Sequence, residues 1–268
     1  MSKVVLITGA SSGLGRATAQ HLYALGYKVY GTSRDPKRYK ESFDFPLLPL
    51  EITDQKSIQH CVNLILEKEK FIDVLINNAG VGITGPMEEI DLDEVRKNFS
   101  TNCFGPLLMA QAVLPQMRVQ KRGLIINITS IAGAMGLPFR GVYSASKSAL
   151  SILSESLRIE VKSFGIEVCT LAPGDYATDI ASRRYHAPIV ENSPYKKAYQ
   201  SSLASMNSHV DNGNSPLEIA LEIEKIITNS KVNVHYFQGP IMQKLSVILK
   251  RILPANQFER LIMNHYKL

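Results

Sequence analysis

The sequence predicts an α/β fold in which one parallel, doubly wound sheet has helices on both faces. Three observations predict it. Short β-branched apolar runs alternate along the chain with longer segments of helical periodicity. A glycine-rich turn joins the first such run to the first helix. The 268 residues, of which 45% are hydrophobic, can bury a substantial core, and no linker or repeat divides them. We therefore expect a single domain over 1–268.

The first strand is expected at 3–8, where Lys3-Val4-Val5-Leu6-Ile7 is short, apolar and β-branched, as buried parallel strands are. It leads into Thr8-Gly9-Ala10-Ser11-Ser12-Gly13-Leu14-Gly15 and a helix at 13–25. Glycines suit a tight turn where the backbone approaches a pyrophosphate and a helix presents its N–H groups to the anion. The spacing differs from Gly-x-Gly-x-x-Gly, so the flanking strand and helix carry the prediction.

Strand and helix signals then alternate as far as residue 171. Strands are expected at 28–32, 47–50, 73–77, 123–129 and 166–171, and helices at 55–69, 98–118 and 142–164. Right-handed crossovers between these strands predict a parallel sheet, with a ligand across the carboxyl ends of the strands. Residues 1–172 are thus expected to form a Rossmann-type dinucleotide-binding core.

The pattern loosens after Pro173. Residues 174–195 are polar and irregular, 194–210 is expected to be a helix or lid, Ser215-Pro216-Leu217-Glu218 opens a helix with proline in its first turn, and a strand is expected near 232–237. In the tail, 238–268, an apolar stripe at helical spacing is interleaved with basic residues. The stripe favours packing on its own domain or at a subunit interface, and peripheral membrane contact is the alternative. It consists of Ile241, Leu245, Ile248, Leu249 and Ile252, with Lys244, Lys250 and Arg251 between them.

The segment Tyr143-Ser144-Ala145-Ser146-Lys147 places a phenol and an ammonium at i and i+4, on one face of a helix. A phenol titrates near pH ~10, too high for efficient proton transfer at neutral pH. A nearby cation favours the phenolate, so the pair would be a usable acid and base. The alternative is a half-buried tyrosine beside a solvated lysine.

Several motifs in order resemble those of the classical short-chain dehydrogenase/reductase family over nearly the whole chain. They are Thr8 to Gly15, Asn77-Asn78-Ala79-Gly80, Asn102, Ser130 thirteen positions before Tyr143, Lys147, and Pro173-Gly174 followed by Thr178. Within the family, Thr32-Ser33-Arg34 and the tail look most like the branch of hydroxysteroid, retinol and acyl-dihydroxyacetone-phosphate reductases.

The resemblance implies a hydride transfer between a nicotinamide and a carbonyl or alcohol. Tyr143 would exchange the proton, Ser130 would donate to the reacting oxygen, and Lys147 would bind the nicotinamide ribose and favour the phenolate. Asn102 would anchor a water that leads protons to Lys147. Alternatively, Ser130 caps a loop and Asn102 is an ordinary helical residue.

The second strand ends at Ser33 and Arg34, where an acidic residue would select NAD and a guanidinium suits a 2′-phosphate. We expect NADP(H), with NAD(H) as the alternative and Arg34 then a solvated residue near Asp35. Ser12 and Glu51 depart from the family pattern. By resemblance the cofactor-binding residues are Gly9, Ser11, Ser12, Gly13, Leu14, Gly15, Ser33, Arg34, Asn77, Ala79, Gly80, Tyr143, Lys147, Pro173, Gly174 and Thr178.

The substrate is expected to be lipophilic, because the segments 82–87 and 137–139 flank the site in similar proteins and offer apolar surface. Residues 173–215 would form the lid. We expect His186 at the surface and Asp175 capping a turn. A carbonyl reductase is favoured over an alcohol dehydrogenase, an isomerase or dehydratase, and a non-catalytic dinucleotide-binding regulator.

Bulk properties bound the remaining possibilities. Cys61, Cys103 and Cys169 are expected to be buried free thiols, and no metal-ligand spacing occurs. With no room for a cleavable signal and no apolar run of transmembrane length, we expect a cytoplasmic protein. The net charge of +6 is spread out and aromatic residues do not interleave with basic clusters, which argues against nucleic acid binding. By resemblance we expect a homodimer or homotetramer formed through 98–118 and 142–164.

Overall fold

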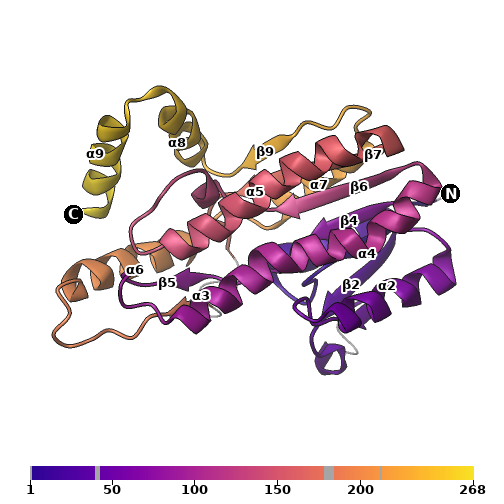
Figure 1. The fold of residues 1–268 in the computed structure, drawn as a ribbon, viewed down its shortest axis with the longest axis horizontal. Helices are drawn as coiled ribbons and strands as arrows, with labels where there is room; N and C mark the ends of the chain where they lie inside the picture. The colour runs from indigo at the N-terminus through magenta and orange to yellow at the C-terminus, as the bar shows by residue number, and fades with distance from the viewer. Residues whose placement is uncertain (1, 40–42, 178–183, 212) are drawn as a thin grey trace.

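The computed structural model describes the chain except for residues 1, 40–42, 178–183 and 212. Its centre is a seven-stranded sheet in the order β3-β2-β1-β4-β6-β7-β9, in which every neighbouring pair is parallel (Figure 1). The order reverses between β1 and β4, the position at which doubly wound sheets bind ligands. The strands are β1 Val4–Ile7, β2 Lys28–Ser33, β3 Leu47–Pro49, β4 Val74–Asn77, β6 Gly123–Ile128, β7 Ile166–Pro173 and β9 His235–Gln238.

Helices cover both faces of the sheet, which confirms the predicted α/β class. On one face, Val4 and Leu6 pack with α2 (Gln55–Glu69), α4 (Gly105–Gln120) and α5 (Gly141–Val161). On the other face, Val5 and Ile7 pack with α1 (Gly13–Ala24) and α7 (Leu217–Thr228). Successive strand residues point to opposite faces, so a strand buried on both sides must be apolar throughout.

The turn from β1 into α1 depends on glycine. Gly9 and Gly13 have φ of 67° and 56°, in the left-handed region where a Cβ is disfavoured. A Cβ on Gly15 would overlap the Asn78 side-chain amide and the Gly9 carbonyl oxygen. The start of α1 is therefore pressed against the end of β4, which brings the N-terminus of α1 to the carboxyl edge of the sheet.

The helix expected at 98–118 begins earlier and is not uniform. It starts as α3 (Leu92–Phe99), continues as a π-helical turn over Ser100–Phe104 and becomes α4. Asp91 begins it by accepting a hydrogen bond from the Asp93 N–H at 2.7 Å. Leu92, Val95 and Phe99 recur at helical spacing behind the Asp91 cap, so the sequence did carry a signal for this earlier start.

Two further differences concern short strands. The strand expected near 232–237 lies at 235–238, because β9 pairs with β7 only from His235 onward. Within the region expected to be irregular, β8 (Tyr185–His186) pairs with β5 (Ile83–Thr84). Two residues are too few to show any periodicity.

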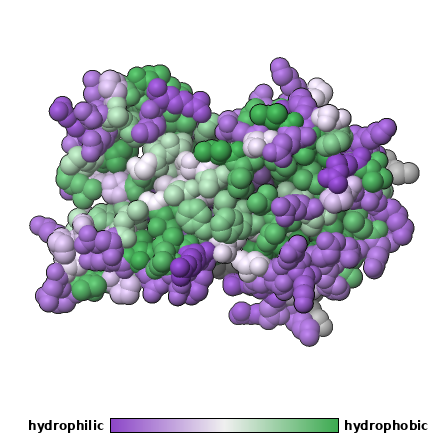
Figure 2. All heavy atoms as spheres, viewed as in Figure 1, coloured by the Kyte–Doolittle hydropathy of each residue, from purple (hydrophilic) through white to green (hydrophobic). Residues whose placement is uncertain are grey.

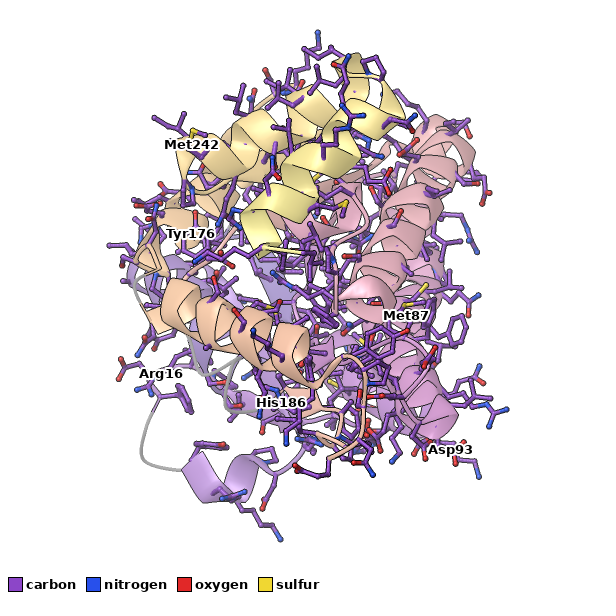
Figure 3. The ribbon with its side chains drawn as sticks, turned by 90° about the vertical axis from the view of Figure 1, so that its left-hand side faces the viewer. Arg16, Met87, Asp93, Tyr176, His186 and Met242 are labelled. Atoms are coloured by element: carbon purple, nitrogen blue, oxygen red, sulfur yellow. The ribbon has the colours of Figure 1, made fainter. Side chains whose placement is uncertain are left out.

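The last part of the chain covers the carboxyl edge of the sheet with α6 (Lys196–Asp211), α8 (Ile241–Ile252) and α9 (Ala255–Tyr266) (Figures 1 and 3). One side of the tail packs on its own domain through Val247 and Phe258, which join Ile131, Met135 and Ala172 in a small core. The expectation that the apolar stripe packs there holds only for Leu249, because Ile241, Leu245, Ile248 and Ile252 are exposed. Among the described residues, no helix has both the length and the apolar character needed to cross a bilayer.

Candidate active site

Three predicted catalytic side chains converge where β6 ends and α5 begins. Ser130 follows β6 by two residues, while Tyr143 and Lys147 lie one turn apart on α5. Tyr143 is 9% exposed and Lys147 only 4%. The Lys147 Nζ donates to the carbonyl oxygen of Ile128 at 2.9 Å, which ties α5 to the end of β6. All three side chains line one cavity.

Burial changes the acidity of the lysine. Desolvation lowers the pKa of the Lys147 ammonium to about 8. The pKa of the Cys103 thiol, which interacts with this lysine, is raised by its own burial, so the thiol stays neutral beside it. Lys147 is therefore a cation at neutral pH that holds its proton less tightly than a lysine in water.

Ser130 serves the loop and the site at once. Its Oγ accepts a hydrogen bond from the Ala132 N–H at 3.2 Å and so begins a 3-10 helix over Ile131–Ala134. Its hydroxyl proton has only a long contact, 3.5 Å, to the Pro173 carbonyl oxygen. The loop-capping alternative is thus realised, yet the O–H remains able to turn toward a bound oxygen atom.

Asn102 lies in the π-helical turn and is fully buried. Its side chain exchanges two hydrogen bonds with the backbone of Val81, both at 2.9 Å, and so holds the segment after β4. A Cβ on Gly80 would lie 3.2 Å from both the Asn102 Oδ1 and the Lys147 Nζ. The two polar groups therefore converge on one space beside Gly80, which a larger residue would fill. Turns of this type often occur at functional sites.

A cavity of about 800 Å³ follows the carboxyl ends of β1, β2, β3 and β4 as far as Tyr143 and Lys147. It collects most of the predicted cofactor residues. These are Gly9, Ser11, Ser12, Gly13, Leu14, Ser33, Arg34, Ala79, Gly80, Tyr143, Lys147 and Pro173. The first turn of α1 faces it without an acidic residue, as an anion requires. The volume of the cavity, the glycine turn at its edge and the absence of acidic residues from the first turn of α1 all fit a bound dinucleotide.

Three predicted residues of the described chain do not line this cavity. The Asn77 amide is buried and donates to Asn127 Oδ1 at 2.8 Å and to the Pro106 carbonyl oxygen at 3.2 Å, so its side chain braces β4 against β6 and α4 rather than lining the cavity. Gly15 packs against the Asn78 side chain and the Gly9 carbonyl oxygen. Gly174 borders the neighbouring cavities instead. Thr178 lies outside the described residues.

The sequence reasoning missed two contributors to this cavity. Asn78 lines it and donates to the carbonyl oxygens of Thr8 and Gly9 at 2.9 and 3.1 Å, which fixes the glycine turn. Arg38, from the 3-10 helix Pro36–Tyr39, lies beside Arg34 at the β2 end of the cavity. Asn78 was visible in the Asn-Asn-Ala-Gly motif. Arg38 gave no signal beyond being the third basic residue after the strand.

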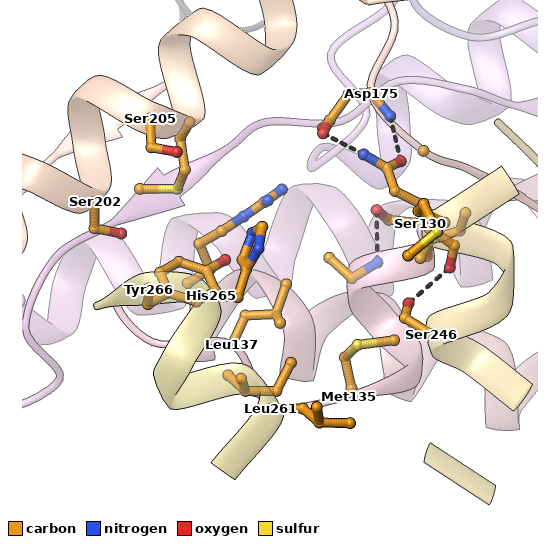
Figure 4. Close-up of a pocket in the computed structure, with 18 of the residues that line it drawn as sticks. Ser130, Met135, Leu137, Asp175, Ser202, Ser205, Ser246, Leu261, His265 and Tyr266 are labelled. Atoms are coloured by element: carbon orange, nitrogen blue, oxygen red, sulfur yellow. Dashed lines mark hydrogen bonds between the residues drawn. The ribbon is translucent and has the colours of Figure 1, made fainter. Parts of the chain in front are cut away.

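A second cavity of about 410 Å³ lies between Ser130 and the helices α6, α8 and α9 (Figure 4). Figure 4 shows Met135, Leu137 and Leu261 together on one side of it, while Ser202 and Ser205 face it from α6. Phe258 and Ile262 add to the apolar wall. A smaller cavity of about 70 Å³ borders both Ser130 and Tyr143 and shares Ser130 with the larger one, so it lies between the apolar wall and Tyr143.

Two arginines that the sequence did not single out border this smaller cavity. The guanidinium carbon of Arg140 lies 5.6 Å from the centroid of the Tyr143 ring. Arg184 is 8% exposed, and its buried Nη1 has no hydrogen-bond partner in the described part of the chain. Burial, and then the neighbouring Arg140, lower the pKa of Arg184. A ligand with oxygen acceptors would satisfy that donor.

Asp175 connects the Pro-Gly segment to the tail. Its carboxylate accepts from the Gln243 amide at 2.6 Å, and its N–H donates to the Gln243 Oε1 at 3.0 Å (Figure 4). The expectation that it caps a local turn was wrong, because its partner lies on α8, far away in the sequence. His186, expected at the surface, is half-buried in β8, with its Nδ1 3.3 Å from Thr84 Oγ1. The three cysteines are buried and free, as predicted.

Comparisons with known proteins agree with this geometry. A family model described as short chain dehydrogenase matches residues 3–188. The chain is 40% identical over 258 residues to a 3-ketodihydrosphingosine reductase of Bacteroides thetaiotaomicron, covering 96% of this chain and 95% of that protein. A crystal structure of a short-chain dehydrogenase from Streptomyces avermitilis superposes with a TM-score of 0.81 at 30% identity, over 100% of this chain and 97% of the other. ElxO with NADP bound superposes with a TM-score of 0.72 at 25% identity, over 88% and 96% of the two chains.

Proposed function

The chain belongs to the short-chain dehydrogenase/reductase family of NAD(P)-dependent oxidoreductases, and from this premise we propose that it reduces the carbonyl group of a lipophilic substrate with NADPH. The observation that carries the proposal is the cavity of about 410 Å³, whose apolar wall ends at Ser130. A chain with a reactive carbonyl at one end would lie along that wall and present the carbonyl to Tyr143. This substrate class also suits the hydroxysteroid and retinol branch that the sequence resembles.

The relative from Bacteroides thetaiotaomicron indicates which class of carbonyl compound to test first. It is named as a reductase of 3-ketodihydrosphingosine, and the two chains match over nearly their whole lengths. Long-chain 3-keto compounds are therefore the first candidates for this chain. The unpartnered Nη1 of Arg184 supports a substrate that carries further oxygen atoms beside the carbonyl.

The preference for NADPH is supported by two guanidinium groups at the end of β2. Arg34 and Arg38 both border the dinucleotide cavity where the adenosine ribose would lie. A 2′-phosphate carries charge that two arginines neutralise, whereas NAD(H) presents only hydroxyl groups there. Asp35 borders the same cavity, so NAD(H) stays the alternative cofactor.

The bound nicotinamide would supply the hydride, and the protein's side chains would manage the charge and proton on the substrate oxygen. The Tyr143 phenol gives its proton to that oxygen, and the Ser130 hydroxyl donates a hydrogen bond to it. The Ser130 Oγ is held by the Ala132 N–H, and its single hydrogen has only the long contact to Pro173 to give up when it donates to the substrate. The Ser130 oxygen is therefore positioned before the reaction, so little reorganisation is needed to stabilise charge on the substrate oxygen.

Lys147 helps Tyr143 to act as the proton donor. As a buried cation it lowers the free energy of the phenolate that remains when the proton has left Tyr143. With a pKa of about 8, it also exchanges protons readily at neutral pH. Asn102 and Lys147 converge beside Gly80, where a water could connect the lysine to solvent. Loss of all these groups would have favoured a non-catalytic regulator, and their convergence supports catalysis.

We also propose a homo-oligomer formed through α4 and α5. Ile152 and Ile159 are exposed on α5, and Phe104 is exposed where α4 begins. Large apolar side chains gathered on two neighbouring helices are typical of subunit interfaces. Sedimentation equilibrium of the full chain measures the assembly.

The proposal is tested by titrating the purified chain with NADPH and NADH while nicotinamide fluorescence is followed. Carbonyl compounds of increasing chain length are then added, and the loss of nicotinamide absorbance is recorded. We expect tighter binding of NADPH and turnover that improves with chain length. Preferred binding of NADH would contradict the cofactor assignment. Turnover confined to small polar carbonyls would contradict the substrate assignment.

A further inference from the structure

Helix α8 carries an apolar stripe that faces away from the protein. Ile241, Leu245, Ile248 and Ile252 are 39% to 78% exposed. Their spacing of four, three and four residues places them along one line of the helix. Val247 points the other way and is buried in the core between the tail and the domain. The helix therefore has one apolar side that the domain covers and another that the described chain leaves open.

The stripe is continuous with the mouth of the apolar cavity. Met242 and Leu261 both border the cavity of about 410 Å³, and they are also 73% and 47% exposed. In Figure 3, Met242 projects outward from the edge of α8. In Figure 2, the lobe formed by α8 and α9 shows hydrophobic side chains between hydrophilic ones on its outer side. Met242 and Leu261 therefore form an apolar part of the border between this surface and the cavity, which Asp175 and Lys267 also line.

The charge around the stripe is strongly positive. Residues 241–268 contain five basic side chains and one acidic side chain, a net charge of +4, whereas the whole chain carries +6. Lys244 and Arg251 each directly precede a residue of the stripe, so they flank its edge. A second copy of the chain packed on the stripe by a two-fold axis would bring these cations together. A surface rich in anionic phosphate groups would neutralise them.

We propose that the exposed stripe of α8, together with Leu261 of α9, docks on an anionic lipid bilayer. The apolar side chains enter the region between headgroups and acyl chains, while Lys244 and Arg251 contact lipid phosphates. The cavity mouth then opens into the bilayer, and the lipophilic substrate enters from there. This last step rests on the proposed function, whereas docking itself does not.

Docking is tested by sedimenting the full chain with vesicles. One set contains phosphatidylcholine alone, and the other contains phosphatidylcholine with phosphatidylglycerol. We expect the protein to sediment with the anionic vesicles, more weakly in high salt, and to remain in solution with the neutral ones. The variant Ile248→Glu with Ile252→Glu should lose about tenfold or more in vesicle affinity, because two charges replace the apolar contact.

A matched variant controls for the added charge. Leu217 and Leu221 lie one turn apart on α7 and are 48% and 41% exposed, so Leu217→Glu with Leu221→Glu adds the same charge on another helix. This variant should bind vesicles with less than about a twofold change. Lys244→Gln with Arg251→Gln should weaken binding to anionic vesicles and reduce its salt dependence.

Three outcomes would overturn docking: no sedimentation of the wild-type chain, equal loss in both glutamate variants, or loss of a dimer instead of vesicle binding in the α8 variant. Turnover of a water-soluble carbonyl with NADPH, measured without vesicles, is read separately. Ile248 and Ile252 do not border either cavity, so the α8 variant should keep that turnover. Absence of turnover in the wild-type chain counts against the proposed function alone.

Discussion

The dinucleotide side of the molecule takes its shape from short turns that follow directly on buried parallel strands, whereas the substrate side is assembled from segments far apart in the chain. Gly9, Ser33 and Ala79 each follow or end a strand of the same sheet, so the sheet alone brings them together. Across the other cavity, Ser130 faces side chains from α6, α8 and α9. If the proposed function is correct, the reacting groups lie on the sheet scaffold, and the substrate is selected by a cover formed by α6, α8 and α9.

The largest expected effect is a loss of turnover in a variant whose dinucleotide and substrate sides both stay folded. Tyr143→Phe removes only the proton donor, so turnover should fall about a thousandfold while NADPH affinity changes less than about twofold. Steady-state kinetics and a fluorescence titration measure the two quantities. Tyr23→Phe, at an exposed position on α1, is the control. A Tyr143→Phe enzyme with substantial turnover would mean that another group protonates the substrate.

The next effect concerns the dinucleotide side alone. Arg34→Asp places a carboxylate where we expect the 2′-phosphate, so the ratio of NADPH to NADH affinity should fall about a hundredfold. Lys37→Asp adds the same charge nearby, but Lys37 does not border the cavity, so its effect should be much smaller. Both are measured by titration with the two cofactors. Unchanged NADPH affinity in Arg34→Asp would remove the reason for assigning NADP(H).

Because Lys147 is buried, the free energy of unfolding should depend on pH. Its pKa is about 8 when folded and ~10.4 when unfolded, so between these values the unfolded chain binds the extra proton. The free energy of unfolding should therefore rise with pH across this window, by at most about 3 kcal/mol. Lys147→Met should lack the rise, and Lys162→Met, at an exposed position, should keep it. Denaturant titrations from pH 7 to about pH 10 measure it. The same slope in all three proteins would refute the buried cation.

The contrast between the two sides explains what the sequence could predict. β1, the glycine turn and the Tyr143 and Lys147 pair are local features whose spacing alone determines their neighbours. Asn77 was assigned to the cofactor because it belongs to the right motif, but of the two asparagines only Asn78 borders the cavity, while the Asn77 side chain braces β4 against β6. Which of two adjacent asparagines faces a ligand depends on how the strand is rotated, and composition does not encode that rotation.

The sequence did not predict the contacts on the substrate side, for a different reason. Asp175 and Gln243 lie 68 positions apart, and no spacing rule links an aspartate after a strand to a glutamine on a terminal helix. Arg184 follows a polar segment and enters the site only because β8 pairs with β5. The apolar stripe of α8 was visible in the sequence. Its direction, away from the domain, required the structure.

The smallest expected effect tests whether the cover acts independently of the scaffold. Gln243 exchanges two hydrogen bonds with Asp175 and is the polar attachment of α8 to the segment after β7. Gln243→Ala removes both, so α8 should move more freely and the KM for a long-chain carbonyl should rise about threefold to tenfold. Gln257→Ala, on the exposed side of α9, is the control. NADPH affinity should be unchanged in both variants, because neither glutamine borders the dinucleotide cavity. A parallel loss of NADPH affinity in Gln243→Ala would show that the cover and the scaffold are coupled and that the two sides cannot be separated in this way.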